Sequence, residues 1–129
     1  MLKGGILNPA INSLLSRVRH TNTLVIADRG FPYWPHIETV DISLIDDIPR
    51  VMDVLKAIQG SYTIGRVFAA QEFLAANPPQ AASELENALL GVPITFESHA
   101  EFKKRVPHAI GLIRTGDTTQ YSNLILESA

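Results

Sequence analysis

The chain has 129 residues, of which 46% are hydrophobic and 19% are charged, and its formal net charge at pH 7 is −2. This length favours one domain with its own core, and the composition is that of a globular rather than a disordered chain. Nucleic acids and anionic membrane surfaces are recognised through clustered Lys and Arg. Here the densest basic cluster is only Lys103-Lys104-Arg105. The sequence therefore predicts no nucleic-acid partner and no membrane partner.

The chain contains no cysteine, which excludes disulfides, thiolate chemistry and cysteine-ligated metals. A cysteine-free chain fits a reducing compartment. The start, MLKGGILNPAI, lacks the apolar core of a signal peptide. No apolar run approaches the roughly 20 residues that a bilayer-spanning helix needs. The sequence therefore predicts a soluble, cytoplasmic protein.

The N-terminal half begins with a helix and then a strand. Residues 8–20 predict a helix in which Asn8 is the cap and Pro9 lies in the first turn. The short apolar run Thr23–Ala27 is rich in β-branched residues and is typical of a strand that is covered on both faces. The pattern then predicts a proline-rich loop, a second strand and a second helix, over 30–35, Thr39–Ser43 and 48–58.

The C-terminal half continues the alternation of strands and helices. The predicted elements are a strand over 61–70, a helical piece over 71–77 stopped by Pro78, a helix over 81–91, a strand over 92–98, a helix over 99–109, and strands over 109–116 and 121–128. This order predicts an α/β fold, namely a single three-layer-like domain with a mostly parallel sheet flanked by helices. In such sheets, ligands bind at the carboxyl ends of the strands, which is where Asp28 and His99 fall.

The four histidines do not form a metal-binding motif. No HxH or HExxH pattern occurs, so no metal and no cofactor are predicted. His20 is most simply a structural histidine at the end of a helix, and the alternative is a general acid or base. His99 is equally able just to begin a helix. His36 and His108 are interpreted as surface residues.

Polar residues after the first strand and in the last one suit a polyol ligand. Asp28 is either a turn cap or a carboxylate that accepts hydrogen bonds from sugar hydroxyls. Tyr121 and Asn123 are two residues apart and would share one face of an extended segment. They are either the polar face of an edge strand or a phenol and an amide aimed at the same ligand. No GxSxG elbow of a serine hydrolase is present.

The order of these motifs resembles the D-ribose pyranase family, which is related to the L-fucose mutarotases. The resemblance begins with KGGILNPAINSLLSRVRHTNTLVIAD and continues through GFP, VDISL, IPRVMDVL and AQEFLAANP. It closes with SHAEFKK and IRTGDTTQYSNLIL, so it covers nearly the whole chain.

This resemblance implies an isomerase of ribose catabolism that interconverts the β-pyranose and β-furanose forms of D-ribose. It implies a homo-oligomer, a decamer of two pentameric rings with sites between subunits, that works without a metal or cofactor. It implies His20 as proton donor and a set of sugar-binding residues, namely Asp28, His99, Tyr121, Ser122 and Asn123.

Two alternatives stay open. One is a mutarotase for another monosaccharide, such as L-fucose. The other is a non-catalytic sugar-binding or transport-accessory module. The presence of His99 favours the ribose branch of the resemblance. Ring interconversion itself needs one group to protonate the ring oxygen and another to remove the anomeric hydroxyl proton, and histidine suits such work because it titrates near neutral pH.

Overall fold

Six strands form one mixed sheet in the computed structural model, which describes residues Met1–Ala129. β6 runs antiparallel to both of its neighbours, β1 and β3, and the other pairs are parallel. The prediction of an α/β domain with a mostly parallel sheet is confirmed. In the order β2-β5-β1-β6-β3-β4 across the sheet, the strands are β2 (Thr39–Asp41), β5 (Gly111–Arg114), β1 (Thr23–Ala27), β6 (Leu124–Ser128), β3 (Ile64–Ala70) and β4 (Ile94–Glu97).

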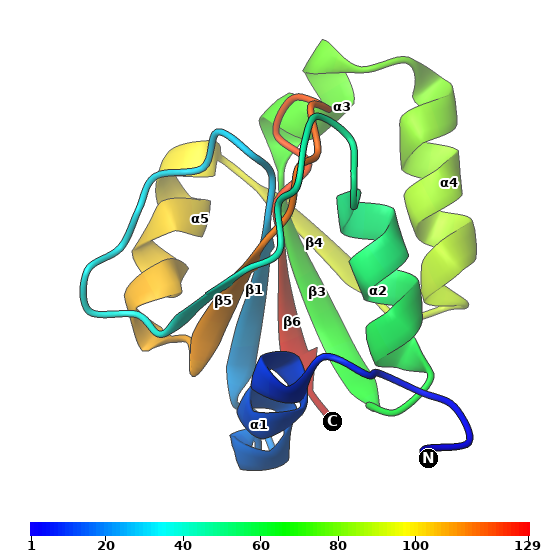
Figure 1. Ribbon diagram of the computed structural model, residues 1–129. Coiled ribbons are helices and arrows are strands. Elements are labelled where there is room, and N and C mark those ends of the chain that lie inside the picture. Colours follow the sequence, from blue (N-terminus) through cyan, green and yellow to red (C-terminus); the bar gives the residue numbers. More distant parts are fainter.

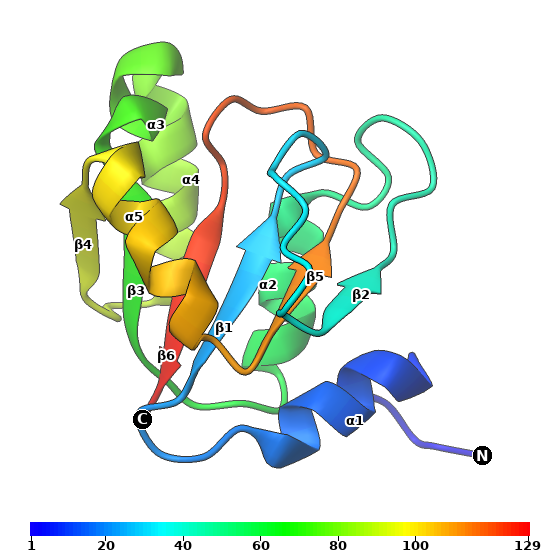
Figure 2. The ribbon, with the colours of Figure 1, turned by 90° about the vertical axis from the view of Figure 1, so that its left-hand side faces the viewer.

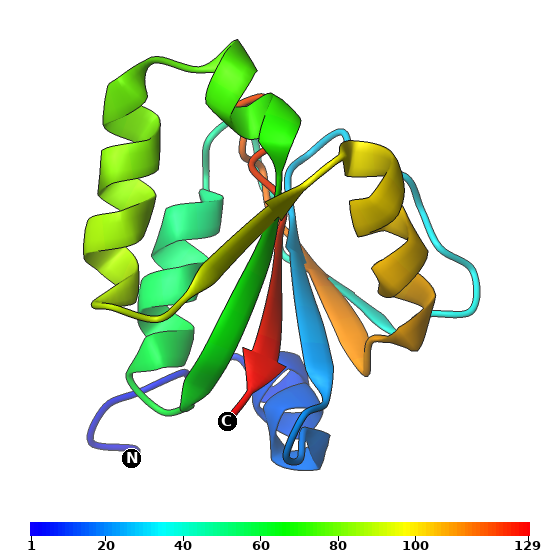
Figure 3. The same cartoon turned by 180° about the vertical axis from the view of Figure 1, so that it is seen from behind.

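Helices cover both faces of the sheet, as Figures 1 and 3 show. One face packs against α1 (Pro9–Arg17), α2 (Val51–Gln59) and α4 (Pro79–Leu89), in a core that includes Leu14, Leu55 and Leu89. The opposite face packs against α5 (His99–Arg105), which continues into the 3-10 turn Val106–His108 and buries Phe102. The short α3 (Gln71–Ala76) follows β3 directly. No helix is both long enough and apolar enough to cross a membrane.

Several element ends differ from the sequence prediction for local reasons. The Asn8 side chain accepts a hydrogen bond from the main-chain N–H of Ile11 at 3.0 Å, so the predicted cap of α1 is confirmed. The helix ends at Arg17 and not at residue 20, because Val18 has extended backbone angles. Conversely, α4 begins two residues earlier than predicted, with Pro79 in its first turn, a position that suits proline.

The largest correction concerns the last strand, which begins at Leu124 and not at residue 121. Tyr121 has a φ of 55°, in the left-handed region, so the chain turns there and cannot be extended. Tyr121 and Asn123 therefore lie in the loop between β5 and β6, and the prediction that they share one face of a strand is wrong.

The two ends of the sheet carry different parts of the chain. Because only β6 is reversed, its amino end meets the carboxyl ends of the five other strands at one edge, the upper edge in Figure 1. The loops 28–38 and 115–123, α3 and the start of α5 gather there. The opposite edge carries α1, the connection from α1 to β1 and the C-terminus, as Figure 2 also shows.

Candidate functional site

A cavity of about 240 Å³ opens at the upper edge of the sheet. Its walls come from the loop after β1, the loop before β6 and the first residue of α5. The residues that line it are Asp28, Gly30, Phe31, Pro32, His99, Gln120, Tyr121 and Asn123. Four residues that the sequence singles out, Asp28, His99, Tyr121 and Asn123, thus meet around one cavity although they come from three separate segments of the chain.

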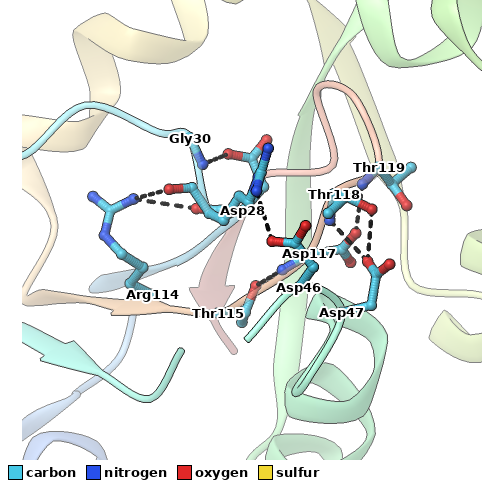
Figure 4. Close-up of polar contacts among 10 residues, drawn as sticks. Asp28, Gly30, Asp46, Asp47, Arg114, Thr115, Asp117, Thr118 and Thr119 are labelled. Carbon is cyan, nitrogen blue, oxygen red and sulfur yellow. Dashed lines mark hydrogen bonds and ion pairs between the residues drawn. The ribbon is translucent and has the colours of Figure 1, made fainter. Parts of the chain in front are cut away.

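Asp28, just after β1, is hydrogen-bonded to Asn123, just before the neighbouring strand β6. The main-chain N–H of Asp28 donates to Asn123 Oδ1 at 2.7 Å, and Asn123 is buried, with 2% of its surface exposed. The Asp28 carboxylate in turn accepts from the N–H of Gly30 at 3.0 Å, as Figure 4 shows. This second bond is the turn cap expected of an aspartate after a strand. The bond uses Asp28 Oδ1, and Asp28 also lines the cavity, so the same side chain can cap the turn and face a ligand.

The surroundings of Asp28 oppose its ionisation. Burial is the main reason that the pKa of Asp28 is raised, and the nearby carboxylate of Asp117 raises it further. The backbone N–H groups of Gly30 and Phe31 and the Asn123 side chain act in the opposite direction. A partly desolvated carboxylate in a cavity is suited to accept hydrogen bonds from ligand hydroxyls.

His99 is the first residue of α5, and aromatic rings hold its imidazole. Its main-chain N–H donates to both carboxylate oxygens of Glu72, each at 3.0 Å. The imidazole lies nearly parallel to the Phe102 ring, at 12° and 5.9 Å, and meets the edges of Tyr121 at 5.1 Å and Phe31 at 6.1 Å between centroids. Burial lowers the pKa of His99, so the neutral imidazole is favoured in the cavity wall.

Ser122 does not face this cavity. Its side chain is buried, with 8% exposure, and its Oγ has no hydrogen-bond partner in the chain. It lines a second, smaller and mostly apolar cavity of about 90 Å³, behind Tyr121, between α2, α4 and the loop before β6. Tyr121 belongs to the walls of both cavities. Of the predicted sugar-binding residues, only Ser122 is thus turned away from the larger hollow.

His20 lies at the other end of the sheet. It is exposed and belongs to the connection between α1 and β1, whereas Asp28 follows β1. A strand of five residues is roughly 16 Å long, at about 3.3 Å per residue. Within one chain, the structure therefore does not bring His20 to the cavity.

Several residues of this region were not singled out from the sequence. No sequence motif marks Glu72 or Phe31 as a site residue, because only the fold places them beside His99. Asp117 could have been found, since it follows β5 and the carboxyl ends of parallel strands meet at one edge. It is 3% exposed, and its carboxylate accepts from the N–H groups of Val51 at 2.9 Å and Thr119 at 2.8 Å. Asp117 thereby anchors the loop before β6 to the start of α2.

The donor and acceptor set of the cavity suits a small polyol. A carboxylate, an imidazole, an amide and a phenol meet there, and each sugar hydroxyl both donates and accepts hydrogen bonds. Aromatic rings supply an apolar wall. The structure has no group of three or more His, Cys, Asp or Glu side chains placed to hold a metal ion.

Comparison with known proteins gives full-length matches. The chain is 38% identical over 128 residues to the D-ribose pyranase of Geobacillus thermodenitrificans, which covers 99% of this chain and 96% of that protein. It is 40% identical over 128 residues to the D-ribose pyranase of Bacillus licheniformis, with 99% and 97% covered.

Solved structures match over the same length. RbsD of Bacillus subtilis complexed with D-ribose has a TM-score of 0.93 at 36% identity, covering 100% of this chain and 98% of that one. The fucose mutarotase of Streptococcus pneumoniae, in complex with L-fucose, has a TM-score of 0.83 at 18% identity, covering 99% and 98%, and this likeness shows the fold alone. The sequence profile of the RbsD / FucU transport protein family matches residues 1–129, and the chain belongs to that family.

Proposed function

We propose that the protein is a D-ribose pyranase, an isomerase that interconverts the β-pyranose and β-furanose forms of D-ribose. The observation that carries this proposal is the full-length similarity to proteins of that name, together with the match to RbsD in complex with D-ribose. No redox step is involved. The hemiacetal opens when the ring oxygen is protonated and the anomeric hydroxyl loses its proton, and it closes again through another hydroxyl.

The larger cavity is the proposed ribose site. Asp28 accepts hydrogen bonds from sugar hydroxyls, while the Asn123 amide and the Tyr121 phenol can both donate and accept. The neutral His99 ring, held between aromatic side chains, completes the wall. Ser122 contributes through its main chain, because its side chain lines the smaller cavity.

The proposed proton donor, His20, acts from a neighbouring copy of the chain. Its distance from the cavity within one chain excludes a role in the same subunit's site. The exposed position of His20 and the exposed apolar side chains of Leu44, Ile45 and Ile48 support assembly into a homo-oligomer. The size proposed from the family resemblance is a decamer of two pentameric rings, and a cytoplasmic location is proposed with it.

Ribose ring exchange tests the proposal directly. Saturation-transfer NMR of D-ribose should show faster exchange between pyranose and furanose signals when the parent protein is added. The His20→Ala variant should lose this acceleration, while His108→Ala, which changes an exposed histidine outside the cavity, should keep it. Exchange at the uncatalysed rate with the well-folded parent protein would contradict the pyranase assignment.

The same measurements separate the two alternatives. A non-catalytic sugar-binding or transport-accessory module would bind ribose without accelerating exchange. A mutarotase for another monosaccharide would accelerate exchange of L-fucose more than exchange of ribose.

A chelator should leave the ribose exchange rate unchanged, because the proposed reaction needs no metal. A loss of activity that added zinc restores would argue against this mechanism.

A further inference from the structure

Arg114 lies next to the proposed ribose site without lining it. It is the last residue of β5, and in the parallel register it is paired with Ala27, the last residue of β1. Its guanidinium group donates to three main-chain oxygens of the following loop, those of Asp28 at 3.2 Å, Arg29 at 3.3 Å and Pro32 at 3.2 Å. Figure 4 shows two of these three contacts, which the guanidinium of Arg114 makes beside Asp28.

The guanidinium of Arg114 has no acidic partner. None of the six ion pairs in the chain involves Arg114. By contrast, the neighbouring Arg29 is paired with Asp46 at 2.6 Å, and both of these side chains are largely exposed. Arg114 is therefore committed to backbone carbonyls, in a partly buried position where an unpaired cation would be costly.

The main chain of Asp28 is held from both neighbouring strands. Asn123, in the loop just before β6, accepts from its N–H, and Arg114, at the end of β5, donates to its carbonyl oxygen. The N–H of the next residue, Arg29, donates to the carbonyl oxygen of Asp117 at 3.0 Å. Removing Arg114 would leave the carbonyl oxygens of residues 28–32 without their only side-chain donor.

We infer that Arg114 is a positioning residue of the sugar site: by binding three carbonyls of the loop 28–32, it holds Asp28, Phe31 and Pro32 in the cavity wall. This inference rests on the proposed ribose-binding function. The loop follows β1 and carries Asp28 itself, so the hydrogen bonds that Asp28 makes with a sugar depend on how well the loop is fixed.

The geometry calls for arginine in particular. One terminal nitrogen of Arg114 donates to two carbonyls and the other donates to the third. A planar guanidinium has five N–H donors in a rigid fork and stays charged at all relevant pH values. A lysine ammonium is a single point and cannot bridge the oxygens of Asp28 and Pro32 in the same way.

The test compares Arg114→Lys and Arg114→Ala with the parent protein, at a temperature where circular dichroism shows all of them folded. Loss of the fork should raise the dissociation constant and KM for D-ribose about 10- to 100-fold, because ribose binding must then order a loop that the charge-assisted hydrogen bonds of Arg114 no longer hold. The exchange rate at saturating ribose should change less. Arg66→Ala is the matched control, because Arg66 also lies on a strand but pairs with Glu127 away from the cavity.

Two further readouts separate positioning from a merely structural role. Ethylguanidinium should restore ribose affinity to Arg114→Ala and should have no effect on Arg66→Ala. Hydrogen exchange of the Gly30 and Phe31 amides should accelerate in both Arg114 variants without a change in the amides of α4. Parent-like ribose affinity and parent-like exchange of these amides in Arg114→Ala would overturn the inference.

The proposed function and this inference fail in different ways. A parent protein that neither binds nor interconverts ribose contradicts the function, whereas the amide exchange still decides whether Arg114 holds the loop. A parent protein that is active, with Arg114 variants that only unfold at lower temperature, contradicts the inference alone.

Discussion

Asp28 and His99 show how the same physical cause acts on an acid and on a base. Burial favours the neutral form of each, so it raises the pKa of Asp28 and lowers the pKa of His99. The two side chains line one cavity. An ionised Asp28 therefore lowers the stability of the folded protein, whereas the shift of His99 favours the neutral ring in the cavity wall.

We predict that Asp28→Asn stabilises the folded protein at pH 7 while weakening ribose binding. The raised pKa means that the folded state binds the Asp28 proton more tightly than the unfolded state does. The stability that this proton provides is present below the unfolded pKa and is lost as pH rises through the folded pKa. Asparagine stays neutral throughout, so its advantage should be present at pH 7 and should largely vanish near about pH 3, below the ordinary pKa of aspartate.

Urea unfolding at the two pH values measures this effect, and calorimetric titration measures ribose binding. Loss of one acceptor for a buried hydroxyl costs about 1–3 kcal/mol, so the dissociation constant should rise about 5- to 150-fold. A variant less stable than the parent at pH 7, or one with unchanged ribose affinity, would argue against the role given to Asp28.

The lowered pKa of His99 predicts that ribose affinity falls on acidification. The groups around the imidazole have opposing effects, since burial and Lys103 lower its pKa while Glu72 and Asp28 raise it. Because the folded pKa lies below the unfolded one, the stability that the neutral His99 provides is present above the unfolded pKa and is lost as pH falls through the folded pKa. NMR titration should give a His99 pKa below that of free histidine. His99→Gln should flatten the pH dependence of ribose affinity near that pKa, and an unaltered dependence would contradict this account.

At the scale of elements, the loop 115–123 is fixed by close contact with the loop after β2. A Cβ atom on Gly116 would lie 2.3 Å from the carbonyl oxygen of Ile45 and 3.0 Å from that of Ile48. The N–H of Gly116 also donates to the carbonyl oxygen of Pro49 at 2.9 Å. Only a residue without a side chain allows these two loops to approach so closely.

Gly116→Ala is therefore expected to displace the loop that carries Tyr121 and Asn123. We expect a loss of about 1–3 kcal/mol in the free energy of unfolding, the usual cost of overpacking, together with weaker ribose binding. Gly4→Ala is the matched control, because a Cβ atom at Gly4 meets nothing within 4 Å. Denaturant titration and calorimetry of both variants provide the measurement, and equal behaviour of the two would show that the contact is unimportant.

At the scale of the whole molecule, the two ends of the sheet carry the two halves of the proposed catalytic site. The cavity lies at the carboxyl ends of the parallel strands, and His20 lies beyond the opposite end of β1. This separation means that an active site containing both must be built from two chains.

Mixed oligomers test this shared site. Co-expressed His20→Ala and Asp28→Asn chains should form some sites in which one chain supplies His20 and the other supplies Asp28. With equal amounts of the two chains and random assembly, about one quarter of the sites regain both groups, so ring exchange at low ribose should exceed that of either variant alone. Light scattering of the parent should show an oligomer at micromolar concentration. A monomer with full activity, or a mixture no faster than its components, would count against assembly across subunits.

The sequence by itself determined the features that depend on neighbours along the chain. Asn8 followed by Pro9 marks the start of a helix because cap and first-turn preferences are local. The apolar, β-branched run Thr23–Ala27 marks a strand covered on both faces, because its composition alone reports its burial. The alternation of such segments was enough to predict an α/β fold with a mostly parallel sheet.

Only the tertiary structure decided how distant segments meet. The insertion of the reversed β6 between β1 and β3 brings Asn123 to the N–H of Asp28, 95 residues earlier in the chain. The left-handed turn at Tyr121 and the three carbonyls held by Arg114 likewise depend on contacts between loops. Strand order and loop approach are set by the packing of the whole core, and no local pattern encodes that packing. The same core keeps His20 at the far end of the sheet from the cavity.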